Sequence, residues 1–170
     1  LAAAPTLLGV TPAAATAGAV TGLSITGSSI DSAAEVRLGR GTYGSASGLA
    51  VTFISASTLQ ATFPATITAA GAYTLFVSNP PYSSADRATL AFTVKPGALV
   101  RIDVSPAAPA IGVNQTRVFA AAGFDAHNNP IAGLSVNWTA LAGGTLSGTP
   151  TTTSATYLAG TVAGAFPNAV

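Results

Sequence analysis

Glycine and proline residues interrupt this 170-residue chain at short intervals, and this spacing constrains its fold more than any other feature. Between the interruptions, apolar residues alternate with small polar ones, as in residues 59–63 and 90–94. Alternation over short runs is typical of half-buried β-strands, and a long helix cannot pass through closely spaced prolines. Many short strands separated by turns predict an all-β chain built from β-sandwiches.

The alternating pattern breaks once, at residues 95–98, and a new alternating run begins near Val100. The break follows one clean strand pattern and precedes another. We therefore predict two tandem sandwich domains, residues 1–95 and 99–170, joined by a short linker at 96–98. So short a linker limits the reorientation of the two domains.

Charged residues make up only 6% of the chain, against about a quarter in ordinary soluble domains. No membrane span accounts for the deficit, because the longest apolar run, residues 118–124, is far short of about 20 residues. A surface of Thr, Ser, Ala and Gly with net charge +1 gives little repulsion between copies. We therefore expect contacts with sister subunits. The six basic residues are scattered along the sequence, which excludes the clustered positive charge of a nucleic-acid-binding surface.

In the first domain, glycines, prolines and one tyrosine recur in a specific order. The runs that carry them are residues 5–12, 23–27, 71–80 and 90–94. In these runs the domain resembles the IPT/TIG immunoglobulin-like family, which implies a β-sandwich. In this setting Tyr73 should point inward, where its hydroxyl can be anchored.

The second domain carries a different set of characteristic runs. They are residues 99–106, 119–125, 128–130, 136–138, 143–145 and 159–161. These resemble bacterial Ig-like (Big) domains, in which Trp138 takes the place of the central buried aromatic. Phe119 and Val136 are expected to join Trp138 in the core of this domain, as Tyr73 does in the first.

The second domain is shorter than its resemblance implies, at 72 residues against about 100 in a complete sandwich. We expect a strand to begin at Phe166 and the last strand to be missing, so the domain is incomplete at its C-terminus. Three explanations stay open: a fragment of a longer protein, which we favour, a strand donated by a neighbouring subunit, or a wrong alignment. The natural donor would be the apolar segment around residues 1–8.

Four residues are candidates for the subunit interface. If Tyr73 faces the core, the alternation places Phe76 on the outer face, and Val118 lies outward in the same way. The open edge of the second domain adds two more. The candidate set is Phe76, Val118, Phe166 and Val170.

Catalysis finds almost no support in the residue types present. The one histidine, His127, lies beside Asp125 and two asparagines, a pattern typical of an Asx turn rather than a metal or general-base site. The chain has no cysteine and no G-x-S-x-G motif, and its five acidic residues are dispersed. We predict no enzyme activity, no cofactor and no metal site.

Two sequons make Asn114 and Asn137 candidate glycosylation sites, with Asn114 in a predicted turn. The composition and both resemblances together favour a structural, non-catalytic segment of a bacterial cell-surface or extracellular assembly, such as a filament, a surface layer or an adhesin stalk. The alternative is an accessory binding module that recognises polysaccharide or a receptor within a larger surface protein.

Overall fold

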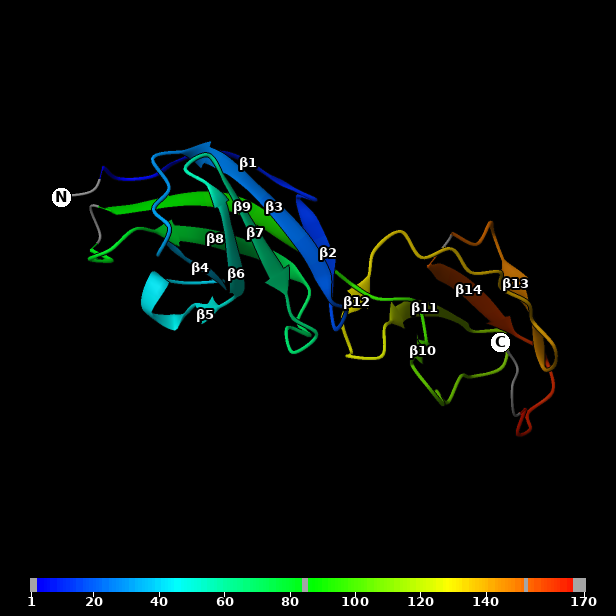
Figure 1. Ribbon diagram of the computed structural model, residues 1–170. Coiled ribbons are helices and arrows are strands. Elements are labelled where there is room, and N and C mark those ends of the chain that lie inside the picture. Colours follow the sequence, from blue (N-terminus) through cyan, green and yellow to red (C-terminus); the bar gives the residue numbers. More distant parts are fainter. Residues whose placement is uncertain (1–2, 84–85, 152, 167–170) are drawn as a thin grey trace. The chain divides into compact units, whose positions relative to one another are not determined.

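The computed structural model describes residues 3–83, 86–151 and 153–166 of the chain (Figure 1). Two compact units divide the chain, Leu1–Gly97 and Ala98–Val170. Every regular element described is a β-strand except one short 3-10 turn, η1 (Tyr43–Ser45). The prediction of an all-β chain is confirmed. No helix in the described ranges is long and apolar enough to cross a membrane.

The first unit contains two sheets. The four-stranded sheet has the order β1 (Thr6–Thr11), β3 (Thr21–Ser28), β7 (Thr58–Phe63), β6 (Ala50–Ser55). The five-stranded sheet has the order β2 (Ala14–Thr16), β9 (Arg87–Lys95), β8 (Gly71–Ser78), β4 (Glu35–Gly39), β5 (Ser47–Gly48). All neighbouring strands are antiparallel except β2 and β9, which run parallel.

One apolar core lies between these two sheets. Leu59 and Phe63 of β7 are fully buried, and so are Leu75 and Val77 of β8. The ring of Phe63 approaches that of Phe92 in the other sheet, with ring centroids 6.0 Å apart. Because successive side chains of a strand point to opposite faces, the residues that pack in this core recur at every second position, as the sequence pattern predicted.

Tyr73 fixes the corner that leads into β8. Its ring packs against the core, and its hydroxyl donates a hydrogen bond to the carbonyl oxygen of Ala69 at 2.8 Å. The guanidinium carbon of Arg40 lies over the ring, 4.8 Å from its centroid. At Gly71 the backbone has φ +143, a conformation that residues with a side chain rarely adopt, so glycine is favoured at this corner. The inward position expected for Tyr73 is confirmed.

Asn79 joins three segments that are far apart in the sequence. Its side chain is fully buried, and its Nδ2 donates to the carbonyl oxygens of Ser29 at 2.7 Å and Ala3 at 2.9 Å. Its Oδ1 accepts the backbone N–H of Asp31 at 3.0 Å. A buried amide satisfied on both ends holds the loops at this end of the sandwich in one arrangement.

The second unit contains one sheet among its described residues. Its order is β10 (Arg101–Ser105), β11 (Thr116–Phe124), β14 (Ser154–Ala159), β13 (Gly144–Ser147), and β12 (Pro130–Ile131) pairs with β11. One face of this sheet is buried around Phe119, Ala155 and Tyr157. The rings of Phe119 and Tyr157 meet edge to face, with centroids 6.3 Å apart. The core position expected for Phe119 is confirmed.

Trp138 and Val136 do not lie in a regular strand. Residues 134–141 carry no regular structure, and both side chains are only half-buried. A strand forms when a neighbouring strand accepts its backbone hydrogen bonds, and no described strand pairs with this segment. The expectation that Trp138 and Val136 are buried core residues is therefore wrong, because both are only half-buried.

Candidate interaction surfaces

The outer face of the β4–β8–β9 sheet carries the first candidate, Phe76, and its expected exposure is wrong. Phe76 does point away from the core that Leu75 and Val77 form, yet only 9% of it is exposed. Tyr43 of η1 covers it with an edge-to-face contact, ring centroids 5.7 Å apart. We therefore do not carry Phe76 forward as an interface residue.

Two arginines hold Tyr43 over this face. The guanidinium carbon of Arg87 lies 3.7 Å from the Tyr43 ring centroid, and that of Arg37 lies 4.8 Å away. Cations over an aromatic face are attracted to its negative potential. Arg37 also pairs with Glu35 at 3.4 Å. Because this loop covers Phe76, the Phe76 side chain is buried even though it lies on the outer face of the sheet, away from the main core.

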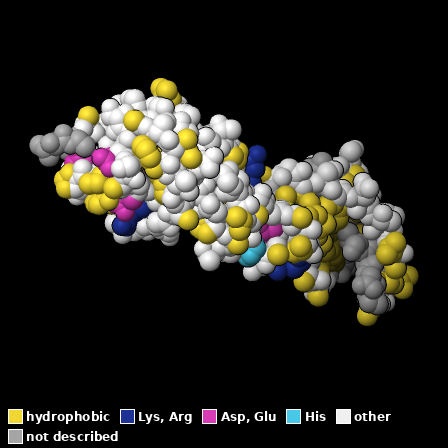
Figure 2. Space-filling view, viewed as in Figure 1, with side chains coloured by type: hydrophobic (Ala, Val, Ile, Leu, Met, Phe, Trp, Pro, Cys, Tyr) yellow, Lys and Arg dark blue, Asp and Glu magenta, His cyan; other side chains and the backbone are white. Residues whose placement is uncertain are grey.

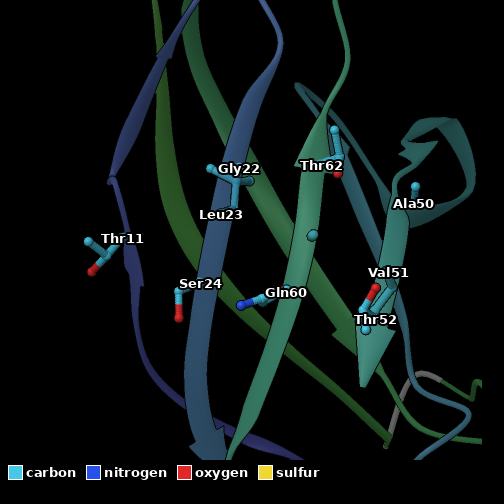
Figure 3. A pocket seen from close by; sticks show the side chains of 10 residues that line it. Thr11, Gly22, Leu23, Ser24, Ala50, Val51, Thr52, Gln60 and Thr62 are labelled. Atoms are coloured by element: carbon cyan, nitrogen blue, oxygen red, sulfur yellow. The ribbon is translucent and has the colours of Figure 1, made fainter. Parts of the chain in front are cut away.

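The outer face of the four-stranded sheet is uncharged and hollowed. A groove of about 410 Å³ lies there, and Figure 3 shows Gln60 directed toward Ser24 on the neighbouring strand. The strand register places Thr11, Ser24, Gln60 and Thr52 in one row across all four strands. This row offers hydroxyl and amide groups that both donate and accept hydrogen bonds. No aromatic ring is among the residues that line the groove.

The second unit carries a larger and more apolar groove, of about 890 Å³. Val104, Phe119 and Tyr157 line it from the sheet, and Phe166 lines it from the end of the described chain. The ring of Phe166 lies against Gly143, where a Cβ would come within 2.5 Å of it. Phe166 is partly exposed, as an interface residue should be, but it belongs to no described strand.

Val118 is the remaining interface candidate within the described residues. Val118 points away from the face that buries Phe119, and more than half of it is exposed. Its outward orientation is confirmed, while its contact with another chain stays a prediction. Val170 lies outside the described residues.

The turn that contains His127 is built around a buried carboxylate. Asp125 is 1% exposed, and its Oδ1 accepts the backbone N–H groups of His127 and Asn129, each at 2.8 Å. Its Oδ2 accepts the side-chain Nδ2 of Asn129 at 2.8 Å. This is the predicted Asx-type turn, in which the carboxylate replaces a backbone acceptor. In the described ranges no group of three or more His, Cys, Asp or Glu could hold a metal ion.

Both candidate glycosylation sites lie on exposed backbone. Asn114 has φ +60 in a turn before β11, and Asn137 lies in the irregular segment beside Trp138. Exposure permits modification of either residue, and occupancy stays a prediction.

The visible surface of the protein is short of charge. Figure 2 shows mostly uncharged and apolar side chains, with a few acidic and basic groups among them. The sequence has six basic and five acidic residues in all. With so few charges, association with another molecule desolvates little ionic surface.

No protein-family model matches the chain. A search of curated proteins finds none similar to it in sequence. Among solved structures, the chain is similar to the Escherichia coli adhesin FdeC, at 19% identity and a TM-score of 0.56, over 94% of this chain. The chain folds as two immunoglobulin-like units in tandem. It spans 55% of that adhesin chain.

Two further solved structures match most of the chain at lower similarity. One is a protein of unknown function from Bacteroides thetaiotaomicron, at 14% identity and a TM-score of 0.42, over 75% of this chain and 37% of that one. The other is the I-band fragment I67–I69 of titin, at 10% identity and a TM-score of 0.33, over 95% of this chain and 54% of that one.

Proposed function

We propose that the chain is a structural, non-catalytic module of a bacterial surface or extracellular assembly, of the kind found in an adhesin stalk, a filament or a surface layer. Its IPT/TIG-like and Big-like domains, at residues 1–95 and 99–170, act as rigid spacers. Their low-charge faces make contacts with other subunits. The similarity to an adhesin over 94% of the chain is the observation that carries the proposal.

Three properties of the described residues support a spacer role. The cores bury aromatic and aliphatic side chains, and the loops at one end of the first unit are tied together by Asn79. The only histidine, His127, donates its backbone N–H within a structural turn. The chain also carries few charges that would keep sister subunits apart.

The test of location is antibody access in the native source cells. An antibody raised against the chain should label intact cells as strongly as permeabilised ones, because the epitope lies outside the cell. An antibody against a cytoplasmic protein serves as the matched control and should label only permeabilised cells. If the antibody against the chain labels only permeabilised cells, the proposal is overturned.

The runner-up is an accessory binding module for polysaccharide, and the uncharged groove of the first unit is the observation that favours it. Sugars bind through hydroxyl and amide groups, which the row from Thr11 to Thr52 supplies. Sugar sites commonly add an aromatic ring, which this groove lacks. Gln60→Ala should release the protein from insoluble polysaccharide if this alternative holds, whereas Gln115→Ala, in the second unit, should not.

A further inference from the structure

Strand β10 is the longest regular sheet edge in the described residues. Six strands end the strand orders of the sheets, namely β1, β6, β2, β5, β13 and β10, and the two-residue β12 pairs with β11 alone among the described strands. A register shift interrupts β1 and β6, and β2, β5 and β13 have only three, two and four residues. β10 pairs with β11 over five residues without a shift. Short or irregular edges resist pairing with another chain, and β10 has neither protection.

The side chains of β10 are all accessible. Ile102 and Val104 are 44% and 39% exposed, and Val100, just before the strand, is 64% exposed. Arg101 and Asp103 alternate with them on the opposite face and are about half-exposed. An edge with three accessible apolar residues on one face and two opposite charges on the other can still gain burial on pairing.

The two charges make the edge complementary to itself. In an antiparallel pair of identical strands centred on Ile102, Arg101 of each copy lies directly opposite Asp103 of the other. On the other face, Ile102 meets Ile102 of the second copy, and Val100 meets Val104 of the second copy. Opposite charges across strands stabilise a sheet, and apolar pairs do so as well.

No other symmetric register that keeps the same faces together has this property. A register centred on Arg101 sets two guanidiniums against each other, and one centred on Asp103 sets two carboxylates against each other. Like charges directly opposite are destabilising. A slip by one residue would place apolar side chains opposite charged ones. The charge pattern therefore selects one register.

The contacts that Arg101 already makes are compatible with this pairing. Its Nε lies 2.8 Å from Oδ1 of Asp103, and its Nη1 donates to Oδ1 of Asn128 at 3.0 Å. The guanidinium also lies 4.8 Å from the ring centroid of Phe124 in β11. These contacts hold the side chain on the outer face, and a guanidinium has further N–H donors for a carboxylate of the second copy.

We propose that two copies of this chain associate through their β10 strands, antiparallel and centred on Ile102, so that the two sheets become continuous. This pairing would be one of the subunit contacts in the proposed function, and in that respect the inference rests on the proposed function. Because the pairing is tested with purified protein in solution, its failure would leave the surface labelling of cells unchanged.

The experiment compares charge variants of the full chain by sedimentation velocity, at concentrations up to about 1 mM. The unaltered chain, of 16.5 kDa, should reach a dimer of twice that mass. Arg101→Asp should weaken the dimer about tenfold or more, since it sets carboxylates against carboxylates, and Asp103→Arg should do the same with guanidiniums. High salt should weaken the unaltered dimer.

The decisive sample is an equimolar mixture of these two variants. In the mixture each substituted charge faces an opposite charge, so a heterodimer should form with the mass of the unaltered dimer. Arg117→Asp, a matched change on β11 away from the edge, should leave the unaltered dimer intact. A mixture that stays monomeric, or a chain that is monomeric throughout, would overturn the proposal.

A second variant tests the apolar side of the same register. Ile102→Lys places two ammonium groups opposite each other at the centre and should abolish the dimer. The partial exposure of Ile102 permits this change within a folded chain, which circular dichroism checks. A dimer that persists in folded Ile102→Lys would place the contact elsewhere and refute the β10 pairing.

Discussion

Removing the carboxylate of Asp125 should destabilise the second unit and leave the first unit intact. Asp125→Ala takes away the acceptor for three hydrogen bonds, two from the backbone N–H groups of His127 and Asn129 and one from Nδ2 of Asn129. The two bonds from Asn129 are buried. The truncated alanine side chain offers these donors no acceptor.

The magnitude follows from the two buried bonds. A hydrogen bond to a charged group contributes about 1.5–3 kcal/mol, so the loss of both bonds should cost about 3 kcal/mol in the free energy of unfolding at the lower end of that range. With an m value of about 1.5 kcal/mol/M, the urea midpoint of the second unit should fall by about 2 M. Trp138 is the only tryptophan of the chain and lies half-buried in the second unit, so its fluorescence reports that transition.

The control is a similar turn in the first unit. Asp31→Ala removes one exposed hydrogen bond, from the backbone N–H of Ala33 to Oδ1 of Asp31 at 2.8 Å. This variant should leave the Trp138 midpoint unchanged. A Trp138 midpoint in Asp125→Ala that equals that of the unaltered chain would refute the structural role assigned to the buried carboxylate.

Three further predictions concern the first unit. Asn79→Ala should lower the free energy of unfolding by about 3 kcal/mol, measured by thermal unfolding, because the three hydrogen bonds of a fully buried amide are lost. A smaller loss than that of the single-bond variant Tyr73→Phe would contradict this. Tyr73→Phe should lower the free energy of unfolding by about 1 kcal/mol, because the hydrogen bond from the Tyr73 hydroxyl to the carbonyl oxygen of Ala69 is lost. Thermal unfolding measures this too, and an unchanged Tm would refute the role of that bond. Tyr43→Ala should uncover Phe76 and increase binding of a hydrophobic dye, whereas equal dye binding would show that Tyr43 is not its cover.

The alternation of apolar and polar residues predicted the strands, because a strand that buries one face has apolar residues at every second position. Leu75 and Val77 face the core of the first unit, and Val118 points away from Phe119 in the second, as the two-residue period requires. The same period placed Phe76 on the outer face correctly. Alternation assigns a face, but it carries no information on what a distant loop lays over that face.

The features that sequence reasoning missed depend on partners far along the chain. The loop with Tyr43 has glycines and no period, so nothing local indicates that it folds back over β8. The segment with Trp138 has strand-like composition, and a strand still requires a neighbour for its hydrogen bonds. The row of polar groups in the first unit's groove depends on strand register, which alternation alone does not set.

Negative-stain electron microscopy of the native material, with gold-labelled antibody against the chain, tests the proposed structural role most directly. The account predicts gold at regular intervals along a filament, stalk or layer, because rigid tandem units set the spacing between labelled sites. Gold confined to isolated particles, with no periodic array, would contradict that role and favour the accessory binding module.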